Sequence, residues 1–272
     1  MPSDFVQVEQ EDGITTIVLD DPGSRNALSW GLVRELSEAI ASASDSRCLI
    51  LRNTPPVFSA GGSIDELLEP KVPLDDLYRA FRALDETSIP TVAAVDGAAI
   101  GAGINLVLCC DVALCTQRSR FDVRFLDVGI HPGGGSLWRL QSAIGTQGAA
   151  ALTLFGETLD GVEAARRGLV WCCVDEADLL QEAIRLARRA ARRDPELVAR
   201  TKRTMTAALT VGDTAAAIDL ELEPQRWSMG RPSFLASLQT LRERIGPPRL
   251  THSSDPVASN DRSEGYRSEG KG

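Results

Sequence analysis

Two glycine-rich segments are the parts of this sequence whose composition could do chemistry. Residues 58–63, FSAGGS, follow a predicted strand, and residues 97–103, GAAIGAG, lie between a predicted strand and a predicted helix. Small residues let a ligand approach the backbone closely, and the first turn of a helix leaves N–H groups without partners. Such donors can stabilise an oxyanion, although turn geometry or close packing would explain either segment taken alone.

Three other kinds of glycine-rich site do not fit the sequence. A dinucleotide site needs a third glycine where Leu106 stands, and a serine-hydrolase elbow needs a glycine where Trp138 stands. A phosphate-binding loop needs glycine and lysine followed by serine or threonine, and this sequence does not occur. An oxyanion site is therefore the chemistry that the two segments leave open.

Composition excludes several classes of protein. The chain has 272 residues, of which 43% are hydrophobic and 25% charged, as in globular proteins with a buried core. Its net charge of −9 argues against a nucleic-acid partner. No apolar run is long enough for a membrane span, and the first ten residues lack the pattern of a signal peptide. These features predict a cytoplasmic protein.

The cysteines are arranged as buried thiols rather than as metal ligands. Two adjacent pairs lie in apolar runs, and no two cysteines have the C-x-x-C spacing. We therefore expect reduced thiols and no metal site. The six residues are Cys48, Cys109, Cys110, Cys115, Cys172 and Cys173.

Hydrophobic periodicity predicts an α/β body followed by helices. A hairpin is expected over residues 5–19, and Ser29 is a predicted helix N-cap. We expect a first domain over residues 1–190, a helical part over 191–249, and a disordered tail over 250–272. The other expected strands are 48–51, 89–95 and 112–115, and the other expected helices are 74–85, 104–110, 179–193, 195–209, 215–227 and 234–245.

Residues 89–103, IPTVAAVDGAAIGAG, closely resemble the signature of the crotonase superfamily, the enoyl-CoA hydratase/isomerase family. Further blocks agree in order and spacing over residues 5–245, among them SRNAL at 24–28, FSAGG at 58–62, CDVA at 110–113 and GIHPGGG at 129–135. The resemblance implies an α/β fold, the crotonase-like ββα superhelix with C-terminal helices, assembled as a homotrimer or a dimer of trimers. It also implies an acyl-CoA thioester as ligand, with no cofactor besides the CoA of the substrate.

The resemblance also assigns roles to particular residues. It implies that the backbone N–H groups of Gly62 and Ala102 form an oxyanion hole for the thioester oxygen. The implied path of CoA and the acyl pocket is lined by residues of the matching blocks. These are Ser24, Arg25, Ala27, Ala60, Ser63, Ile64, Asp65, Phe125 and Pro132.

The sequence departs from the family pattern where the acids belong. Family hydratases use two glutamates to move protons, and Asn105 and Phe125 stand in those positions. Some relatives use an aspartate where this chain has Gly133. Asn105 can orient water or a carbonyl group but cannot titrate, so ordinary hydratase chemistry is not expected.

Two nearby side chains could transfer protons instead. Asp127 lies between the two altered positions, and His131 is the only histidine before the predicted tail. Asp127 could equally form a salt bridge, and His131 a hydrogen bond in a loop or subunit interface. Asp122 and Arg124 are expected to form an ion pair, and Asp65 and Glu66 a solvated helix start.

Two functions from different classes therefore stay open. The protein could be an enzyme that stabilises a thioester enolate, with Asp127 or His131 managing protons. Alternatively, it could be a non-catalytic acyl-CoA-binding protein that kept the pocket and lost the chemistry. The intact glycine segments favour the enzyme.

Overall fold

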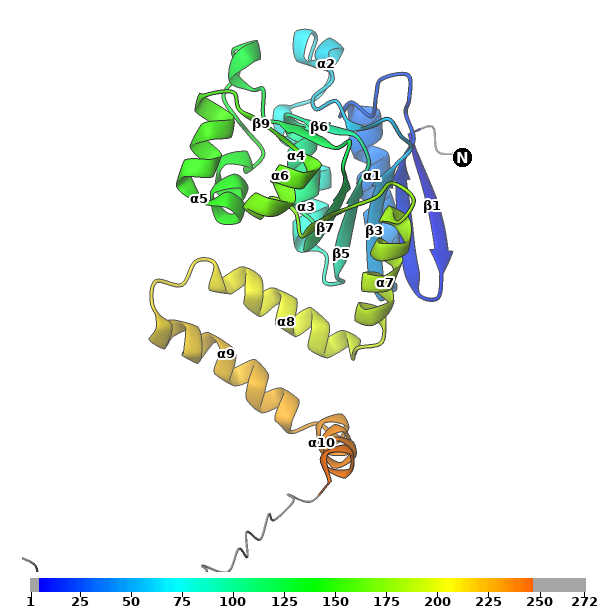
Figure 1. Cartoon of the computed structure of the whole chain (residues 1–272), viewed down its shortest axis with the longest axis vertical. Coiled ribbons are helices and arrows are strands. Elements are labelled where there is room, and N and C mark those ends of the chain that lie inside the picture. The colour runs from blue at the N-terminus through cyan, green and yellow to red at the C-terminus, as the bar shows by residue number, and fades with distance from the viewer. Residues whose placement is uncertain (1–4, 247–272) are drawn as a thin grey trace, which may run out of the picture. The chain divides into compact units, whose positions relative to one another are not determined.

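The computed structural model describes residues 5–246 and confirms the α/β fold (Figure 1). The predicted hairpin is present as β1 (Val6–Glu11) and β2 (Ile14–Leu19), which pair antiparallel. From β2 onward, the main sheet is parallel and runs in the order β1-β2-β3-β5-β7-β10. Its other strands are β3 (Cys48–Asn53), β5 (Thr91–Val95), β7 (Val112–Thr116) and β10 (Cys172–Val174).

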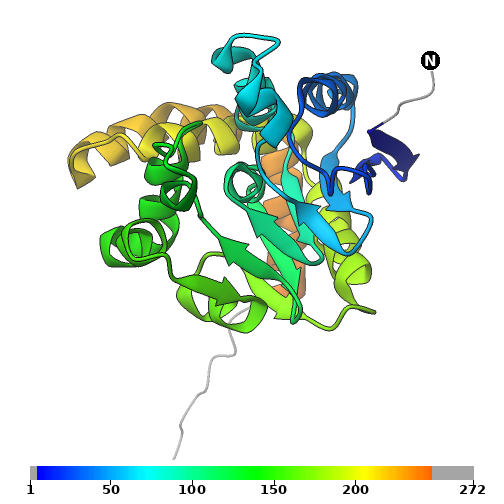
Figure 2. The same cartoon turned by 90° about the horizontal axis from the view of Figure 1, so that it is seen from above.

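Helices cover both faces of this sheet, which explains why its strands are apolar on both sides (Figures 1 and 2). In β3, Leu49 and Leu51 pack into the larger core with α1 (Trp30–Ser42), whereas Ile50 packs with α7 (Leu179–Ala191). The predicted N-cap of α1 is confirmed, since the Ser29 side chain accepts a hydrogen bond from Leu32 N at 3.3 Å.

A second, four-stranded sheet was not predicted. It runs β4-β6-β8-β9, with β8 parallel to β6 and antiparallel to β9. The segment 97–103, interpreted from sequence as a turn, contains β6, because three small or aliphatic residues are too few to give a strand pattern. The strands are β4 (Val57–Ser59), β6 (Ala98–Ile100), β8 (Arg120–Asp122) and β9 (Thr158–Asp160).

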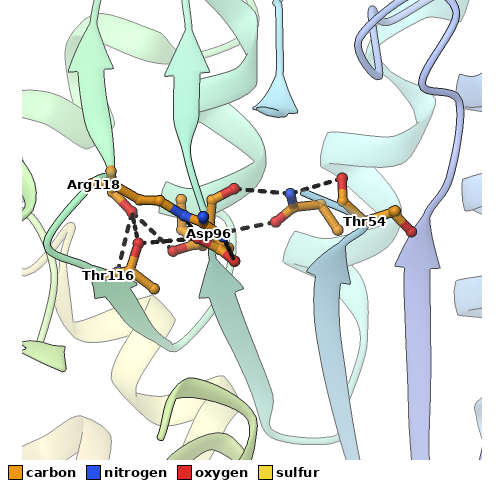
Figure 3. A network of polar contacts seen from close by, with 7 residues as sticks. Thr54, Asp96, Thr116 and Arg118 are labelled. Carbon is orange, nitrogen blue, oxygen red and sulfur yellow. Dashed lines mark hydrogen bonds and ion pairs between the residues drawn. The ribbon is translucent and has the colours of Figure 1, made fainter. Parts of the chain in front are cut away.

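The chain passes from one sheet to the other at Gly97, directly after β5. Gly97 has a φ of 97°, and a methyl group there would overlap the carbonyl oxygen of Pro56. A polar network centred on Asp96 holds this crossing (Figure 3). The Asp96 carboxylate pairs with both arms of the Arg118 guanidinium, at 2.6 and 2.5 Å, and accepts a hydrogen bond from Thr116. Asn53 bonds the Asp96 backbone on the other side, so β3, β5 and β7 are tied together here.

The predicted helix over 74–85 is wrong in its first turn. That turn is the 3₁₀ helix η1 (Leu74–Tyr78), and the α-helix α3 (Arg79–Glu86) begins only at residue 79. Pro73 precedes η1, and two acidic residues follow in its first turn. Phe81 and Leu84 of α3 are buried in the core.

The remaining helices are α2 (Ile64–Leu68), α4 (Ala102–Leu108), η2 (Leu126–Val128), α5 (Ser136–Leu154, non-helical at Gly145), α6 (Gly161–Arg167), α8 (Pro195–Ala208), α9 (Thr214–Met229) and α10 (Pro232–Ile245). Among them, α4, α8, α9 and α10 correspond to predicted helices and α2 to the predicted helix start at Asp65 and Glu66, whereas η2, α5 and α6 were not predicted. Across residues 5–246, every helix is too short or too polar to cross a lipid bilayer.

The chain separates into two compact units, Met1–Pro224 and Gln225–Gly272. The described part of the second unit consists of the end of α9 and the whole of α10. The predicted boundary at residue 190, where the strand-containing region ends, stays a prediction. The predicted tail over 250–272 lies outside the described residues.

Candidate active site

The two glycine-rich segments meet at the carboxyl ends of two neighbouring parallel strands. Residues 60–63 follow β4 and residues 101–103 follow β6, and β4 pairs with β6. Gly61 has a φ of 88°, and a methyl group there would lie 2.6 Å from the Ile100 oxygen and 3.5 Å from the Ala102 nitrogen. Gly103 packs as closely against Ser59, where an added methyl group would lie 2.8 Å from the backbone oxygen. Glycine is therefore required for this approach.

Within residues 5–246, the backbone N–H groups of Gly62 and Ala102 have no backbone acceptor. Gly62 forms an isolated bridge with Leu28, but its neighbours supply the hydrogen bonds, from Leu28 N to Gly61 O at 2.7 Å and from Ser63 N to Leu28 O at 3.4 Å. Ala102 is the first residue of α4, where an N–H has no partner within the helix. Both predicted donors therefore belong to adjoining turns.

The predicted CoA-lining segments, 24–27 and 60–65, also lie side by side. Ala60 N donates to Arg25 O at 3.0 Å, and the Ser24 hydroxyl accepts from Ala27 N at 3.3 Å while donating to Asp21. Arg25 has a φ of 59° and an exposed side chain. The turn at 24–27 thus presents an exposed cation beside the first glycine turn.

Asn26 holds these two segments together, a role that the sequence did not indicate. Its side chain is buried and donates to Val57 O at 2.8 Å while accepting from Asp21 N at 2.7 Å. Its backbone oxygen accepts from the Ser59 hydroxyl at 2.7 Å. A buried asparagine in a turn between two predicted elements was the signal that could have identified it.

The acidic start of α2 is only partly solvated. Ile64 and Asp65 are exposed, as a solvated helix start predicts. Glu66 contradicts the prediction, because its carboxylate accepts the backbone N–H of Trp30 at 2.8 Å. Trp30 is the first residue of α1, so this carboxylate satisfies an otherwise unpaired helix donor.

Asn105 is completely buried one helical turn after Ala102. Its side-chain nitrogen donates to Gly133 O at 3.1 Å, whereas its side-chain oxygen has no hydrogen-bond partner among the described residues. A buried amide oxygen without a partner carries a desolvation cost of about 1–3 kcal/mol. Asn105 therefore ties α4 to the glycine loop that contains Gly133.

Arg139 holds the same glycine loop from α5. Its side chain is 10% exposed, donates to Gly134 O and pairs with Asp85 of α3. The loop over residues 133–135 is thus fixed between three helices. Tyr78 completes this enclosure, because a methyl group at Gly133 would overlap the Tyr78 hydroxyl. Sequence reasoning missed Tyr78, although it is the only tyrosine before the predicted tail.

The two predicted proton-transfer residues are exposed. Asp127 lies in η2, and His131 places Nδ1 2.7 Å from Pro132 O. Phe125, which precedes η2, is half-buried against the core, and Pro132 is buried. Phe125 and Pro132 are thus apolar groups near the start and end of the loop that carries both candidates.

The predicted pair of Asp122 and Arg124 is confirmed. Arg124 donates to the buried Asp122 carboxylate at 2.5 Å, and Arg120 approaches the same oxygen at 3.4 Å. Two guanidinium groups therefore contact this carboxylate, and its role is to hold the local structure.

The cysteines are free thiols, as predicted, and three of them are buried. Burial raises the pKa of Cys48 and that of Cys110 to about 12, with a smaller contribution from the charge of Asp111. Such thiols stay protonated at neutral pH and are poor nucleophiles. Within residues 5–246, no group of three His, Cys, Asp or Glu side chains is placed to hold a metal ion.

The structure is an α/β protein with glycine turns at the ends of the parallel strands β4 and β6. Comparison with known proteins gives its family. The profile of the enoyl-CoA hydratase/isomerase family matches residues 9–247. The chain belongs to this family, which is part of the crotonase superfamily.

Similar proteins carry hydratase names. The probable enoyl-CoA hydratase EchA14 of Mycobacterium tuberculosis is 36% identical over 256 residues, which cover 89% of this chain and 98% of that protein. The 2,3-dehydroadipyl-CoA hydratase of Escherichia coli is 32% identical over 195 residues, 69% of this chain and 76% of that protein. The solved structure of a Geobacillus kaustophilus enoyl-CoA hydratase subunit superposes with a TM-score of 0.82 at 25% identity, covering 90% and 98% of the two chains.

Proposed function

We propose that this protein binds an acyl-CoA thioester with its carbonyl oxygen between the N–H groups of Gly62 and Ala102. The observation that carries the proposal is the close approach of the two turns, with Gly61 packed against Ile100 O and beside Ala102 N. Two fixed donors aimed at one oxygen stabilise the negative charge of an enolate, and each is worth roughly 3–4 kcal/mol of barrier. The proposed reaction is therefore one that passes through a thioester enolate.

The CoA part of the ligand is proposed from the family and from the neighbouring segments. The Escherichia coli relative is named for a CoA thioester substrate. In this chain, the exposed Arg25 beside Ala60 offers a cation for a CoA phosphate. We expect butanoyl-CoA to bind measurably in calorimetry. A bound-ligand structure with the thioester oxygen far from both Gly62 and Ala102 would contradict the proposal.

Ordinary hydration is not the proposed reaction, because neither residue at the family's acid positions can titrate. Asn105 is committed to Gly133 O, and Phe125 offers only a half-buried apolar ring. We expect crotonyl-CoA hydration to be very slow. The measurement is the loss of the ultraviolet absorbance of the enoyl thioester. A rate on the order of hundreds per second would show that these two positions do not limit the chemistry.

Asp127 and His131 are the proton-transfer residues proposed from sequence. Their exposure keeps both accessible to solvent protons. If His131 acts in catalysis, His131→Ala loses turnover while acyl-CoA affinity is retained; unchanged turnover removes His131 from the mechanism. Asp127→Asn tests the second residue in the same way.

A non-catalytic acyl-CoA-binding protein is the second candidate. It is favoured by the complete burial of Asn105, which places an amide where a titrating acid would be needed. A panel of acyl-CoA thioesters of different chain lengths, read by mass spectrometry, separates the two functions. Consumption of any member establishes an enzyme, whereas binding without consumption across the panel supports the binder.

We further propose a homotrimer or a dimer of trimers located in the cytoplasm. Phe155 and Trp171 are 80% and 72% exposed in the single chain, as apolar side chains at a subunit interface would be. Light scattering during size-exclusion chromatography gives the mass directly. A monomer at micromolar concentration would contradict this assembly.

A further inference from the structure

The Tyr78 hydroxyl lies against the glycine loop at Gly133. A methyl group at Gly133 would overlap this hydroxyl, so the phenol oxygen packs directly on the Gly133 backbone. The Tyr78 ring stacks on Phe81 with centroids 6.0 Å apart and an interplanar angle of 27°. Phe81 is buried, which fixes the ring, whereas Tyr78 itself is half-buried and keeps access to small molecules.

Tyr78 and Asn105 both contact the backbone of Gly133. Asn105 donates to the oxygen of Gly133, and the Tyr78 hydroxyl packs against the same residue, where an added methyl group would overlap it. The Gly133 backbone therefore connects the two side chains. Asn105 in turn lies one helical turn from Ala102, so their Cβ atoms are roughly 5–6 Å apart. A continuous set of contacts thus runs from the second proposed oxyanion donor to a phenol.

The hydroxyl of Tyr78 has the chemistry that the altered acid positions lack. Asn105 and Phe125 cannot exchange protons, and Gly133 has no side chain. A phenol can donate a proton and, as tyrosinate, accept one. Tyr78 is half-buried, so a small ligand can reach its hydroxyl.

We propose that Tyr78 exchanges a proton with the α-carbon of the bound acyl thioester. This inference rests on the proposed function, because it needs the thioester oxygen at Gly62 and Ala102. The phenol O–H bond breaks, the enolate electron pair forms a C–H bond at the α-carbon, and water returns a proton to the tyrosinate. In the reverse direction, tyrosinate removes an α-proton and the enolate charge moves onto the held oxygen.

The surroundings keep Tyr78 in its protonated form at neutral pH. Burial raises its pKa above the ordinary value of 10.0, the Gly134 backbone lowers it in part, and the negative charge of Asp75 raises it further. On the loop side, the charge of Arg139 is paired with Asp85, and Asn105 on α4 is neutral. Protonation of an enolate is therefore favoured, and the reverse exchange should speed up as pH rises towards the tyrosine pKa.

The test is deuterium exchange at the α-carbon of butanoyl-CoA in heavy water with the full chain. By mass spectrometry, we expect the wild-type exchange rate to rise about tenfold per pH unit from 7 to 9, because only tyrosinate accepts the proton. Tyr78→Phe keeps the stacked ring and should exchange at least about 100-fold more slowly. Its butanoyl-CoA affinity by calorimetry and its melting temperature should stay close to wild type.

Two further variants separate proton transfer by Tyr78 from a purely structural role. Tyr266→Phe changes the chain's other tyrosine, which lies outside the described residues, and should exchange like wild type. Replacing Tyr78 with the more acidic 3-fluorotyrosine should move the pH profile to lower pH, which a purely structural role would not do. Equal exchange by Tyr78→Phe, loss of exchange only in His131→Ala or Asp127→Asn, or binding without any exchange overturns the inference. Absence of butanoyl-CoA binding instead contradicts the proposed function.

Discussion

The proposed oxyanion turns and the glycine loop at residues 133–135 are held by different kinds of interaction. The turns around Gly62 and Ala102 are set by backbone pairing between β4 and β6, and by glycines that no other residue can replace. The glycine loop is set by the side chains of Tyr78, Asn105 and Arg139. Backbone geometry tolerates few substitutions, whereas side chains change one at a time. We therefore expect substitutions to be tolerated less well in the turns proposed to hold the ligand than in the side chains around the glycine loop.

The largest effect is expected from a substitution in the turns that are set by backbone pairing. Gly61→Ala places a methyl group 2.6 Å from Ile100 O at a left-handed φ of 88°. The first turn must move away from Ala102, which removes one oxyanion donor. We expect turnover or α-proton exchange to fall roughly 100-fold or more, equivalent to about 3 kcal/mol.

Gly23→Ala is the matched control for this change. Gly23 lies in the neighbouring exposed turn, and an added methyl group would come no closer than 3.7 Å to Asp21. We expect wild-type exchange from this variant. Equal losses in both variants would mean that the backbone turns are not specially constrained.

An intermediate effect, on the free energy of unfolding, is expected from Asn105→Asp beside the glycine loop. The new carboxylate would face Gly133 O at the position of the lost donor, without solvent. Urea unfolding at neutral pH should show a loss of about 1–3 kcal/mol. Burial raises the pKa of such a carboxyl group, and its protonated form can donate to Gly133 O. The deficit should therefore shrink as pH falls; a deficit independent of pH would contradict the proposed role of the amide.

The smallest expected effect concerns the tether between α2 and α1. Glu66→Gln replaces a charged acceptor of Trp30 N with a neutral one. We expect a loss of about 0.5–1 kcal/mol in thermal unfolding, with acyl-CoA affinity little changed. Glu69→Gln, at the exposed C-terminal end of α2, should change neither quantity. A larger loss from Glu69→Gln would assign the effect to general charge rather than to the cap.

Periodicity predicted most of the first sheet and the helices α1, α4 and α7 to α10, because amphipathic patterns specify those elements locally. The second sheet was missed because β6 and β8 have three residues each and exist only through pairing. Tyr78 was missed for a related reason. Its contact with Gly133 joins residues far apart in sequence, and no local pattern shows that a helix start will meet a distant glycine loop.

The pairing of β4 with β6 sets the distance between the two proposed oxyanion turns. Neighbouring strands lie roughly 4.8 Å apart wherever they pair, whatever side chains they carry. Residues 60–63 and 101–103 follow two paired strands, so the distance between these segments is set by the ordinary spacing of neighbouring strands. In the proposed complex, the atom bound between the two turns must be small, whereas the groups attached to it can vary. Accepting a wider acyl group would then require only side-chain substitutions. Accepting a different atom between the two turns would require a different strand spacing.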